Sequence, residues 1–395
     1  MRRRGHPVRL LAAALMVMTV LPRWADVAAA APVEQNPAQW PVSPAPSVSA
    51  AAAVVMDWWT GTVLHAKNAH VRRDPASTTK VLTALIALER GNLDDLVTIS
   101  RRAAYTPGST MHLKEGEVYS LHDLLYGLLL RSGNDAAVAI AEHIAGSVEE
   151  FAKLMNARAR EIGAVNSHFT NPHGLTEPNH YSTAYDLALI TREALRNPMF
   201  AKVVSLREAS LTYEPQNRDV VMHNTNRLLE MLPGADGVKT GTTAAAGNCL
   251  IASATRDDHK LISVVLHARD RWSDSARLLE WGFDNFRMVY LARKDEVVIQ
   301  APVRRGMPGY VPLAVEGDLA VLLPRHEAGD LRIRLDIHRS LMAPVARGQV
   351  VGRVLAVQGE QVKAEAALYA AADVRRRSVW EGIRQGLQFL WPLHS

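Results

Sequence analysis

The sequence is short of cysteine, of long apolar runs and of compact metal-binding clusters. Its 395 residues include a single cysteine, Cys249, which excludes an intramolecular disulfide. Cys249 lies in the apolar segment "GNCLIAS", which favours a buried strand residue over a nucleophile. No CxxC, HExxH or similar ligand spacing occurs, and no block of Lys and Arg is interleaved with aromatic residues. The missing ligand spacings predict that the chain binds no metal. The missing basic block and a net charge of only +5 predict that it binds no nucleic acid.

The N-terminus carries an apolar run that is too short to span a bilayer. The segment "LLAAALMVMTVL" has 12 residues, whereas a spanning helix needs about 20. Four arginines precede it in "MRRRGHPVRL", and small residues follow it in "DVAAAAP". This layout is typical of a secretory signal peptide, residues 1–31, cleaved near Ala31. We therefore expect an exported protein without an N-terminal anchor.

The rest of the chain divides by composition. Residues 32–47 are rich in Pro and Ala and are predicted to be a linker. Residues 48–290 contain strand-like segments, then a helical block, then strands and a closing helix that we expect to be capped by Ser273. This order predicts an α/β (α+β) domain in which helices flank an antiparallel sheet. Residues 291–372 are rich in Val and Gly with polar–apolar alternation, which predicts a small all-β domain.

The C-terminal segment, residues 373–395, has a helical apolar stripe. Arg375, Arg376 and Arg377 precede it. The stripe consists of Val379, Trp380, Ile383, Leu387, Leu390 and Trp391. Charges on the opposite face disfavour a spanning helix, and the tryptophans favour an amphipathic helix that lies at a membrane interface. The alternative is a helix docked on the protein's own surface.

The segment "DPASTTK" places a serine three residues before a lysine at the start of an apolar helical run. Ser77 and Lys80 then lie one turn apart on one helix face, so the amine can reach the hydroxyl. A serine needs such a base to become a nucleophile, and burial can lower the pKa of the lysine enough for that role. The alternative is that Ser77 is a helix cap and Lys80 an ordinary helical residue.

Two further short motifs follow. Ser132-Gly133-Asn134 interrupts two apolar helices and can present a hydroxyl and an amide to a cleft, although these are also ordinary turn residues. Lys239-Thr240-Gly241 lies on a predicted strand, where its small Gly would let a substrate backbone lie alongside.

Each motif alone is weak, but their order and local settings together are specific. With "NPHGLTEPNHYSTAYDLALI" and "ADGVKTGTT", they make residues 48–290 resemble the low-molecular-mass penicillin-binding proteins of the serine-type D-alanyl-D-alanine carboxypeptidase family. The β domain and terminal helix match that family's layout. The middle motif reads Ser-Gly-Asn where class A β-lactamases have Ser-Asp-Asn, which favours a peptidase.

The resemblance implies a role for each motif residue. Ser77 would attack the D-Ala-D-Ala peptide bond, Lys80 would accept its proton, and Ser132 with Lys239 would protonate the leaving amine. Substrate contacts would come from Asn134, Thr240, Gly241, Thr242 and Arg271. Among these, Thr242 and Ser77 would supply backbone N–H groups to the oxyanion, and Thr240 with Arg271 would hold the terminal carboxylate. His173, beside Asn-Pro, is interpreted as structural.

These roles predict an enzyme that trims peptidoglycan stem peptides without any cofactor. β-Lactams should acylate Ser77 and leave it slowly. The predicted location is the outer face of the cytoplasmic membrane, to which the C-terminal helix would attach. The alternatives are a DD-endopeptidase, weak β-lactamase activity and a non-catalytic murein-binding scaffold of the same fold.

Overall fold

The computed structural model describes residues 40, 42–213, 218–327, 330–337, 340–378 and 380. The predicted signal peptide and most of the predicted terminal helix lie outside these residues. Internal contacts divide the chain after Phe286 into two units, which we call the sheet–helix unit and the β unit. No helix within the described ranges has both the length and the apolar character needed to cross a membrane.

A five-stranded antiparallel sheet organises the sheet–helix unit, with strand order β2-β1-β9-β8-β7. The strands are β1 (Ala52–Asp57), β2 (Val63–Lys67), β7 (Ala235–Thr243), β8 (Gly247–Arg256) and β9 (His259–Ala268). A tight turn of two residues with positive φ, Asp257 and Asp258, connects β8 to β9. Because β7 is an edge strand, one of its sides is left without a strand partner in the described chain.

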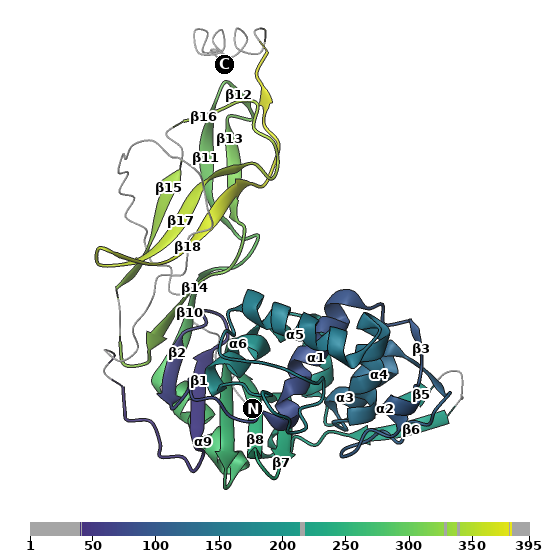
Figure 1. Cartoon of the computed structure of the whole chain (residues 1–395). Helices are drawn as coiled ribbons and strands as arrows, with labels where there is room; N and C mark the ends of the chain where they lie inside the picture. The colour runs from purple at the N-terminus through teal and green to yellow at the C-terminus, as the bar shows by residue number, and fades with distance from the viewer. Residues whose placement is uncertain are drawn as a thin grey trace, which may run out of the picture. The chain divides into compact units, whose positions relative to one another are not determined.

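Helices cover both faces of this sheet. Alternate β1 residues Ala52, Val54 and Met56 belong to the core shared with the helical block, whereas Val55 points toward helix α9 (Arg271–Asn285). Every residue of β1 is therefore buried, as expected for a strand covered on both faces. In Figure 1 helices α1 to α5 gather to one side of the sheet. The predicted antiparallel sheet with flanking helices is confirmed.

The helical block follows the sequence pattern closely. Its elements are the 3-10 turn Ala76–Thr79, α1 (Lys80–Arg90), α2 (Arg101–Ala104), α3 (Leu121–Leu129), α4 (Asn134–Ala145), α5 (Val148–Ile162), α6 (Ala184–Ala194), α7 (Pro198–Ser205) and α8 (Leu228–Met231). Two small two-stranded antiparallel sheets accompany it: β3 (Leu96–Thr98) with β4 (Val118–Ser120), and β5 (Glu208–Tyr213) with β6 (Arg218–His223). Ser147 caps helix α5, because its hydroxyl accepts from the Glu150 N–H at 3.1 Å, which is the first of the two hydrogen bonds of a capping box.

One helix start differs from the prediction. Helix α9 is capped by Asp270, not by Ser273, because the Asp270 carboxylate accepts from the N–H groups of Trp272 and Ser273 at 3.1 and 3.2 Å. A carboxylate that satisfies two free amides and faces the positive end of the helix dipole is a better cap than a hydroxyl inside the first turn. Arg271 consequently becomes the first residue of the helix.

The β unit is built on a six-stranded sheet of order β15-β17-β18-β13-β11-β16, antiparallel except where β11 meets β16. Its strands are β10 (Phe286–Ala292), β11 (Val297–Arg304), β12 (Gly306–Met307), β13 (Tyr310–Val315), β14 (Leu319–Pro324), β15 (Leu331–Ile337), β16 (Leu341–Met342), β17 (Val350–Gln358), β18 (Gln361–Ala370) and β19 (Arg375–Arg376). The buried strand β14 and residues such as Val311, Leu313 and Leu368 form its core. An all-β C-terminal domain is confirmed, but Arg375 and Arg376 pair with β12 as a strand and are not helical.

Candidate active site

The serine of "STTK" lies inside a 3-10 turn. Thr78 fastens the turn, because its hydroxyl donates to the Pro75 carbonyl oxygen at 2.6 Å. Ser77 caps neither this turn nor α1, since Pro75 and Thr79 hold those positions. The helix-cap alternative is therefore wrong, and the Ser77 hydroxyl is left to another partner.

That partner is Lys80, the first residue of α1. Its Nζ lies 3.0 Å from Ser77 Oγ and donates to Asn134 Oδ1 at 2.6 Å and to the His173 carbonyl oxygen at 2.8 Å. The Lys80 side chain is completely buried. Burial, reinforced by the positive charge of Lys239 and opposed by Asp135, holds the pKa of Lys80 well below its usual value. A neutral amine at this distance can accept the proton of the Ser77 hydroxyl.

Asn134 and Ser132 enter from the break between α3 and α4. Asn134 accepts from Lys80 through Oδ1 and donates through Nδ2 to the Pro107 carbonyl oxygen at 2.6 Å. Ser132, two residues earlier, is almost fully buried and has a left-handed φ of 61°. A non-glycine residue in this conformation is strained, and such strain gathers at functional sites.

Asp135 stabilises this break, and its role is not evident from the sequence. Its carboxylate accepts from the Thr110 hydroxyl at 2.6 Å and from the N–H groups of Met111 and Leu113 at 2.9 and 3.2 Å. These bonds fasten residues 110–113 to the start of α4. Its position directly after Ser-Gly-Asn was the one feature of the sequence that could have indicated this role.

The Lys-Thr-Gly motif lies on the edge strand β7, directly against the turn that carries Ser77. A Cβ atom at Gly241 would stand 2.9 Å from the Ser77 amide nitrogen, so the strand and the turn can approach this closely only with glycine there. Thr240 shares a hydrogen bond with Thr225, 2.8 Å between the two hydroxyl oxygens. Thr225 was missed by the sequence analysis, because it lies in no motif.

Lys239 is a second buried lysine. Its Nζ donates to the Thr240 carbonyl oxygen at 3.2 Å, and only 1% of the residue is exposed. Burial, with a further contribution from the Arg271 charge, lowers the pKa of Lys239 to about 7. Near neutral pH it can therefore both give and take a proton.

Arg271 reaches the same strand from the start of α9. One guanidinium nitrogen donates to the Gly241 carbonyl oxygen at 2.9 Å, to Thr242 Oγ1 at 2.8 Å and to the Cys249 carbonyl oxygen at 3.3 Å. The guanidinium of Arg271 is thus held beside Thr242. The sequence analysis expected Arg271 to bind the terminal carboxylate of the substrate. Cys249 itself is buried.

Of the predicted residues, Ser77, Lys80 and Asn134 are joined by direct hydrogen bonds. Gly241 adjoins Ser77, Arg271 contacts Thr242, and Ser132 lies beside Asn134 in the chain. The ring of His173 accepts from the Leu175 N–H at 3.1 Å, and burial lowers the pKa of this ring to about 3, so it is neutral. Its carbonyl oxygen, not its ring, contacts Lys80.

A serine beside a buried lysine, next to the edge strand of an antiparallel sheet with helices on both faces, defines the penicillin-recognising class of serine enzymes. The D-alanyl-D-alanine carboxypeptidase family profile matches residues 39–270, and the profile of the penicillin-binding protein 5 C-terminal domain matches residues 286–376. The chain belongs to the D-alanyl-D-alanine carboxypeptidase family.

Individual relatives agree with this assignment. The chain is 35% identical over 336 residues to D-alanyl-D-alanine carboxypeptidase DacF of Bacillus subtilis, covering 83% of this chain and 86% of the relative. It is 38% identical over 326 residues to DacC of Escherichia coli, covering 78% and 80%. Among solved structures, penicillin binding protein 5 from Haemophilus influenzae is similar with a TM-score of 0.67 and 34% identity, covering 85% of this chain and all of that one.

The buried charge of Lys239 yields a prediction about stability. Below pH 7 both the folded and the unfolded protein carry this charge, and only the folded protein has removed it from water. We expect Lys239→Met to raise the free energy of unfolding at pH 6 by about 1–2 kcal/mol and the melting temperature by about 2–4 °C. This gain should shrink as the pH rises from 7 toward 10.5, where the unfolded chain also loses the proton.

Thermal unfolding at pH 6 and pH 9 measures this effect. Lys202→Met, at an exposed position, is the matched control and should change little. A lower melting temperature for Lys239→Met at pH 6 would contradict the assigned cost of burial.

Proposed function

We propose that this protein is an exported serine-type D-Ala-D-Ala carboxypeptidase that removes the terminal D-alanine from peptidoglycan stem peptides through a Ser77 acyl-enzyme. The supporting observation is the contact of 3.0 Å between Ser77 Oγ and the buried Lys80 amine, whose pKa is lowered. Membership in the carboxypeptidase family supports the choice of substrate.

Acylation begins with proton transfer from Ser77 to neutral Lys80. Ser77 Oγ then forms a bond to the carbonyl carbon of the penultimate D-alanine. The negative charge that develops on the carbonyl oxygen is stabilised by the backbone N–H groups of Ser77 and Thr242. The close approach of β7 to the Ser77 amide at Gly241 supports this pairing of donors.

Collapse of the tetrahedral intermediate breaks the C–N bond to the terminal D-alanine. The leaving amine takes a proton through Ser132 from Lys239, whose pKa of about 7 suits a donor at neutral pH. Water then attacks the ester and gives one proton to the neutral Lys239. The bond between the acyl carbon and Ser77 Oγ breaks, Ser77 recovers its proton from Lys80, and the shortened peptide leaves with a free carboxyl group. A β-lactam forms the same kind of ester with Ser77, but its leaving group stays attached to the acyl group. We therefore expect this ester to hydrolyse slowly.

Substrate binding is assigned to the residues around the nucleophile. Asn134 would hydrogen-bond the amide of the stem peptide, and Thr240 with Arg271 would bind the terminal carboxylate. Arg271 is suited to this because its guanidinium already lies beside Thr242 Oγ1, and a planar cation binds carboxylates well. The edge of β7 would accept the peptide backbone as an added strand.

The direct test compares the wild-type protein with Ser77→Ala. Wild type should release D-alanine from a short peptide ending in D-Ala-D-Ala and should be labelled covalently by a fluorescent penicillin. Ser77→Ala should lose both, because no other group can form the ester. Ser210→Ala, on the exposed hairpin strand β5, is the control and should behave as wild type.

Labelling of Ser77→Ala at the wild-type level would refute the nucleophile. If wild type is labelled but releases no D-alanine, cross-linked muropeptides become the next substrate, because an endopeptidase would then be favoured. If wild type is neither labelled nor active, the scaffold alternative gains support.

The low pKa of Lys239 gives the reaction a pH dependence. As the pH rises through about 7, Lys239 loses the proton that it donates, so D-alanine release should fall. Arginine stays charged throughout this range. We expect Lys239→Arg to be slower at neutral pH, because its guanidinium is larger, and to lack the fall between pH 7 and 9. A pH–rate profile for both proteins decides this, and an identical fall in Lys239→Arg would exclude Lys239 as its cause.

We further propose the division of the chain given by its sequence: an export signal at 1–31, a linker at 32–47, the catalytic domain at 48–290 and the β domain at 291–372. Residues 373–395 would attach the protein to the outer face of the cytoplasmic membrane. Most of the helix proposed for this attachment lies outside the described residues.

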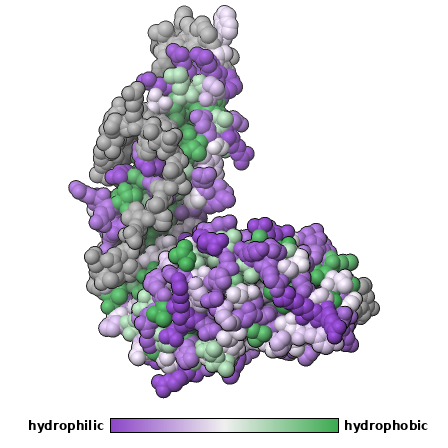
Figure 2. Space-filling view, viewed as in Figure 1, coloured by the Kyte–Doolittle hydropathy of each residue, from purple (hydrophilic) through white to green (hydrophobic). Residues whose placement is uncertain are grey.

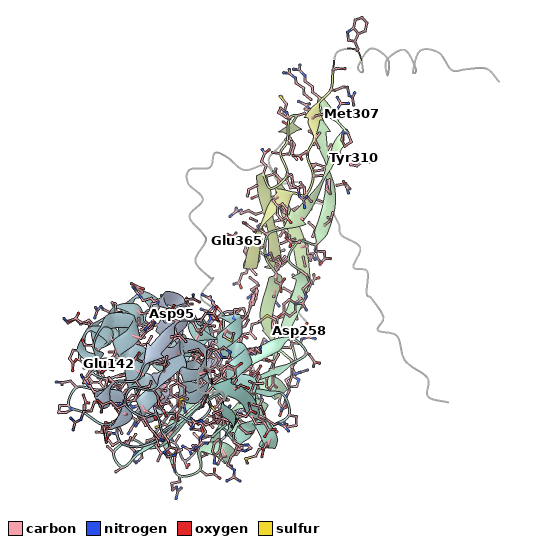
Figure 3. All side chains as sticks on the ribbon, turned by 90° about the vertical axis from the view of Figure 1, so that its right-hand side faces the viewer. Asp95, Glu142, Asp258, Met307, Tyr310 and Glu365 are labelled. Carbon is pink, nitrogen blue, oxygen red and sulfur yellow. The ribbon has the colours of Figure 1, made fainter. Side chains whose placement is uncertain are left out.

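The part of the β unit around strands β12 and β19 has features that support attachment to an anionic surface. Arg304 and Arg305 are exposed beside the strand pair that contains Arg375 and Arg376. Apolar side chains accompany them, since Met307, Tyr310 and Met342 are 44%, 57% and 57% exposed. Figure 3 shows Met307 and Tyr310 together at this end, and Figure 2 shows hydrophilic and hydrophobic residues mixed along the unit. Cations interleaved with apolar groups suit the headgroup region of a membrane.

Deletion of residues 379–395 tests the attachment. The shortened protein should no longer sediment with vesicles that contain anionic lipid, and it should keep its D-alanine release, because the active site lies within residues 77–271. A glutamate pair, Trp380→Glu with Trp391→Glu, should have the same effect through loss of apolar contact. Undiminished sedimentation of the deletion variant would refute the anchor.

A further inference from the structure

One segment, residues 170–175, contacts the turn and helix that carry Ser77 and Lys80 at several points. The Thr83 hydroxyl donates to the Pro172 carbonyl oxygen at 2.6 Å, and Lys80 donates to the His173 carbonyl oxygen at 2.8 Å. Gly174 has a φ of +86°, and a Cβ atom there would stand 1.8 Å from the Ala76 carbonyl oxygen. This segment therefore helps to place the Lys80 amine, together with Asn134.

His180 connects this segment to the 3-10 turn that carries Ser77. Its Nε2 lies 3.0 Å from the hydroxyl of Thr79, the residue directly before Lys80. Its Nδ1 accepts from the backbone N–H of Thr170, the first residue of the segment, at 3.1 Å. The ring is 3% exposed and packs edge-on against Phe169 with the ring centres 5.7 Å apart.

The backbone contact fixes the tautomer of His180. A backbone N–H can only donate, so Nδ1 must be the acceptor, and the hydrogen of the neutral ring must be on Nε2. That hydrogen points to Thr79 Oγ1. Burial, together with the nearby His168, lowers the pKa of His180 to about 4, so the neutral ring is the form present at physiological pH.

We propose that His180 is a positioning residue for acylation, which acts by holding Thr79 and Thr170 at a fixed separation so that Lys80 stays aligned with Ser77. The inference rests on the proposed reaction at Ser77. His180 touches neither residue of that pair and takes no part in proton transfer. Its effect is geometric, and a displacement of a base by about 1 Å can slow a reaction about 100-fold.

Matched substitutions separate the hydrogen bonds from the bulk of the ring. His180→Phe keeps a buried ring against Phe169 and removes both hydrogen bonds. His180→Gln places an amide N–H near the Nε2 position and can restore the bond to Thr79. We expect the second-order rate constant for acylation by a penicillin to fall about 10- to 100-fold in His180→Phe and to stay within about 3-fold of wild type in His180→Gln.

The partner hydroxyl provides a second route to the same answer. Thr79→Val should slow acylation as His180→Phe does, and Thr79→Ser, which keeps the hydroxyl, should not. Because His180→Phe already breaks the bond that Thr79→Val removes, the double variant His180→Phe/Thr79→Val should be about as slow as His180→Phe alone. The comparison of Thr79→Val with Thr79→Ser remains decisive if His180→Phe fails to fold.

A control separates positioning from stability. His259 is also buried in the sheet–helix unit and lies 3.0 Å from Asp57, at the end of β9 away from Ala268 and the Lys-Thr-Gly strand. His259→Gln should lower the melting temperature and leave the acylation rate of the folded protein unchanged. Wild-type acylation rates in His180→Phe and Thr79→Val, or equal loss in His180→Gln and His180→Phe, would overturn the inference. A wild-type protein that is not acylated at all would instead refute the reaction at Ser77.

Discussion

The burial of two lysine amines in one small volume is the constraint on which the site depends. An ammonium group removed from water is unfavourable, and a second one nearby makes each less favourable still. Burial therefore lowers the pKa of both Lys80 and Lys239, so that near neutral pH Lys80 can act as a base and Lys239 as a proton donor. The surrounding structure keeps water out and supplies acceptors, among them Asn134 and the His173 carbonyl oxygen.

Three separate parts of the chain must approach closely for this to happen, and glycines permit it. Gly241 lets the edge strand lie against the Ser77 amide, and Gly174 lets residues 170–175 lie against the Ala76 carbonyl oxygen. Any side chain at either position would push the backbones apart. The chemistry of the lysines and the absence of side chains at these glycines are therefore two requirements of one arrangement.

The sequence was sufficient for the fold class and for the motifs, because each motif combines a local pattern with a fixed order. The three-residue spacing at a helix start suggested that Ser77 and Lys80 face one another, and the break at Ser132 is visible between two apolar runs. His180, Thr225 and Asp135 could not be given roles in this way, because their partners are 15 to 101 residues distant or are backbone atoms. Asp270 was missed as a cap for a different reason: Ser273, three residues later, is also a common capping residue, and only the observed hydrogen bonds distinguish the two.

The position of β7 at the edge of the sheet also affects whether the protein associates with other chains. A strand with one unpaired side is a template for joining other chains, and a sheet that ends so is prone to self-association. Here the 3-10 turn with Ser77 lies against β7 at Gly241, so it covers part of that edge. The turn that carries the serine therefore also leaves less of β7 open to strand pairing with a neighbouring molecule.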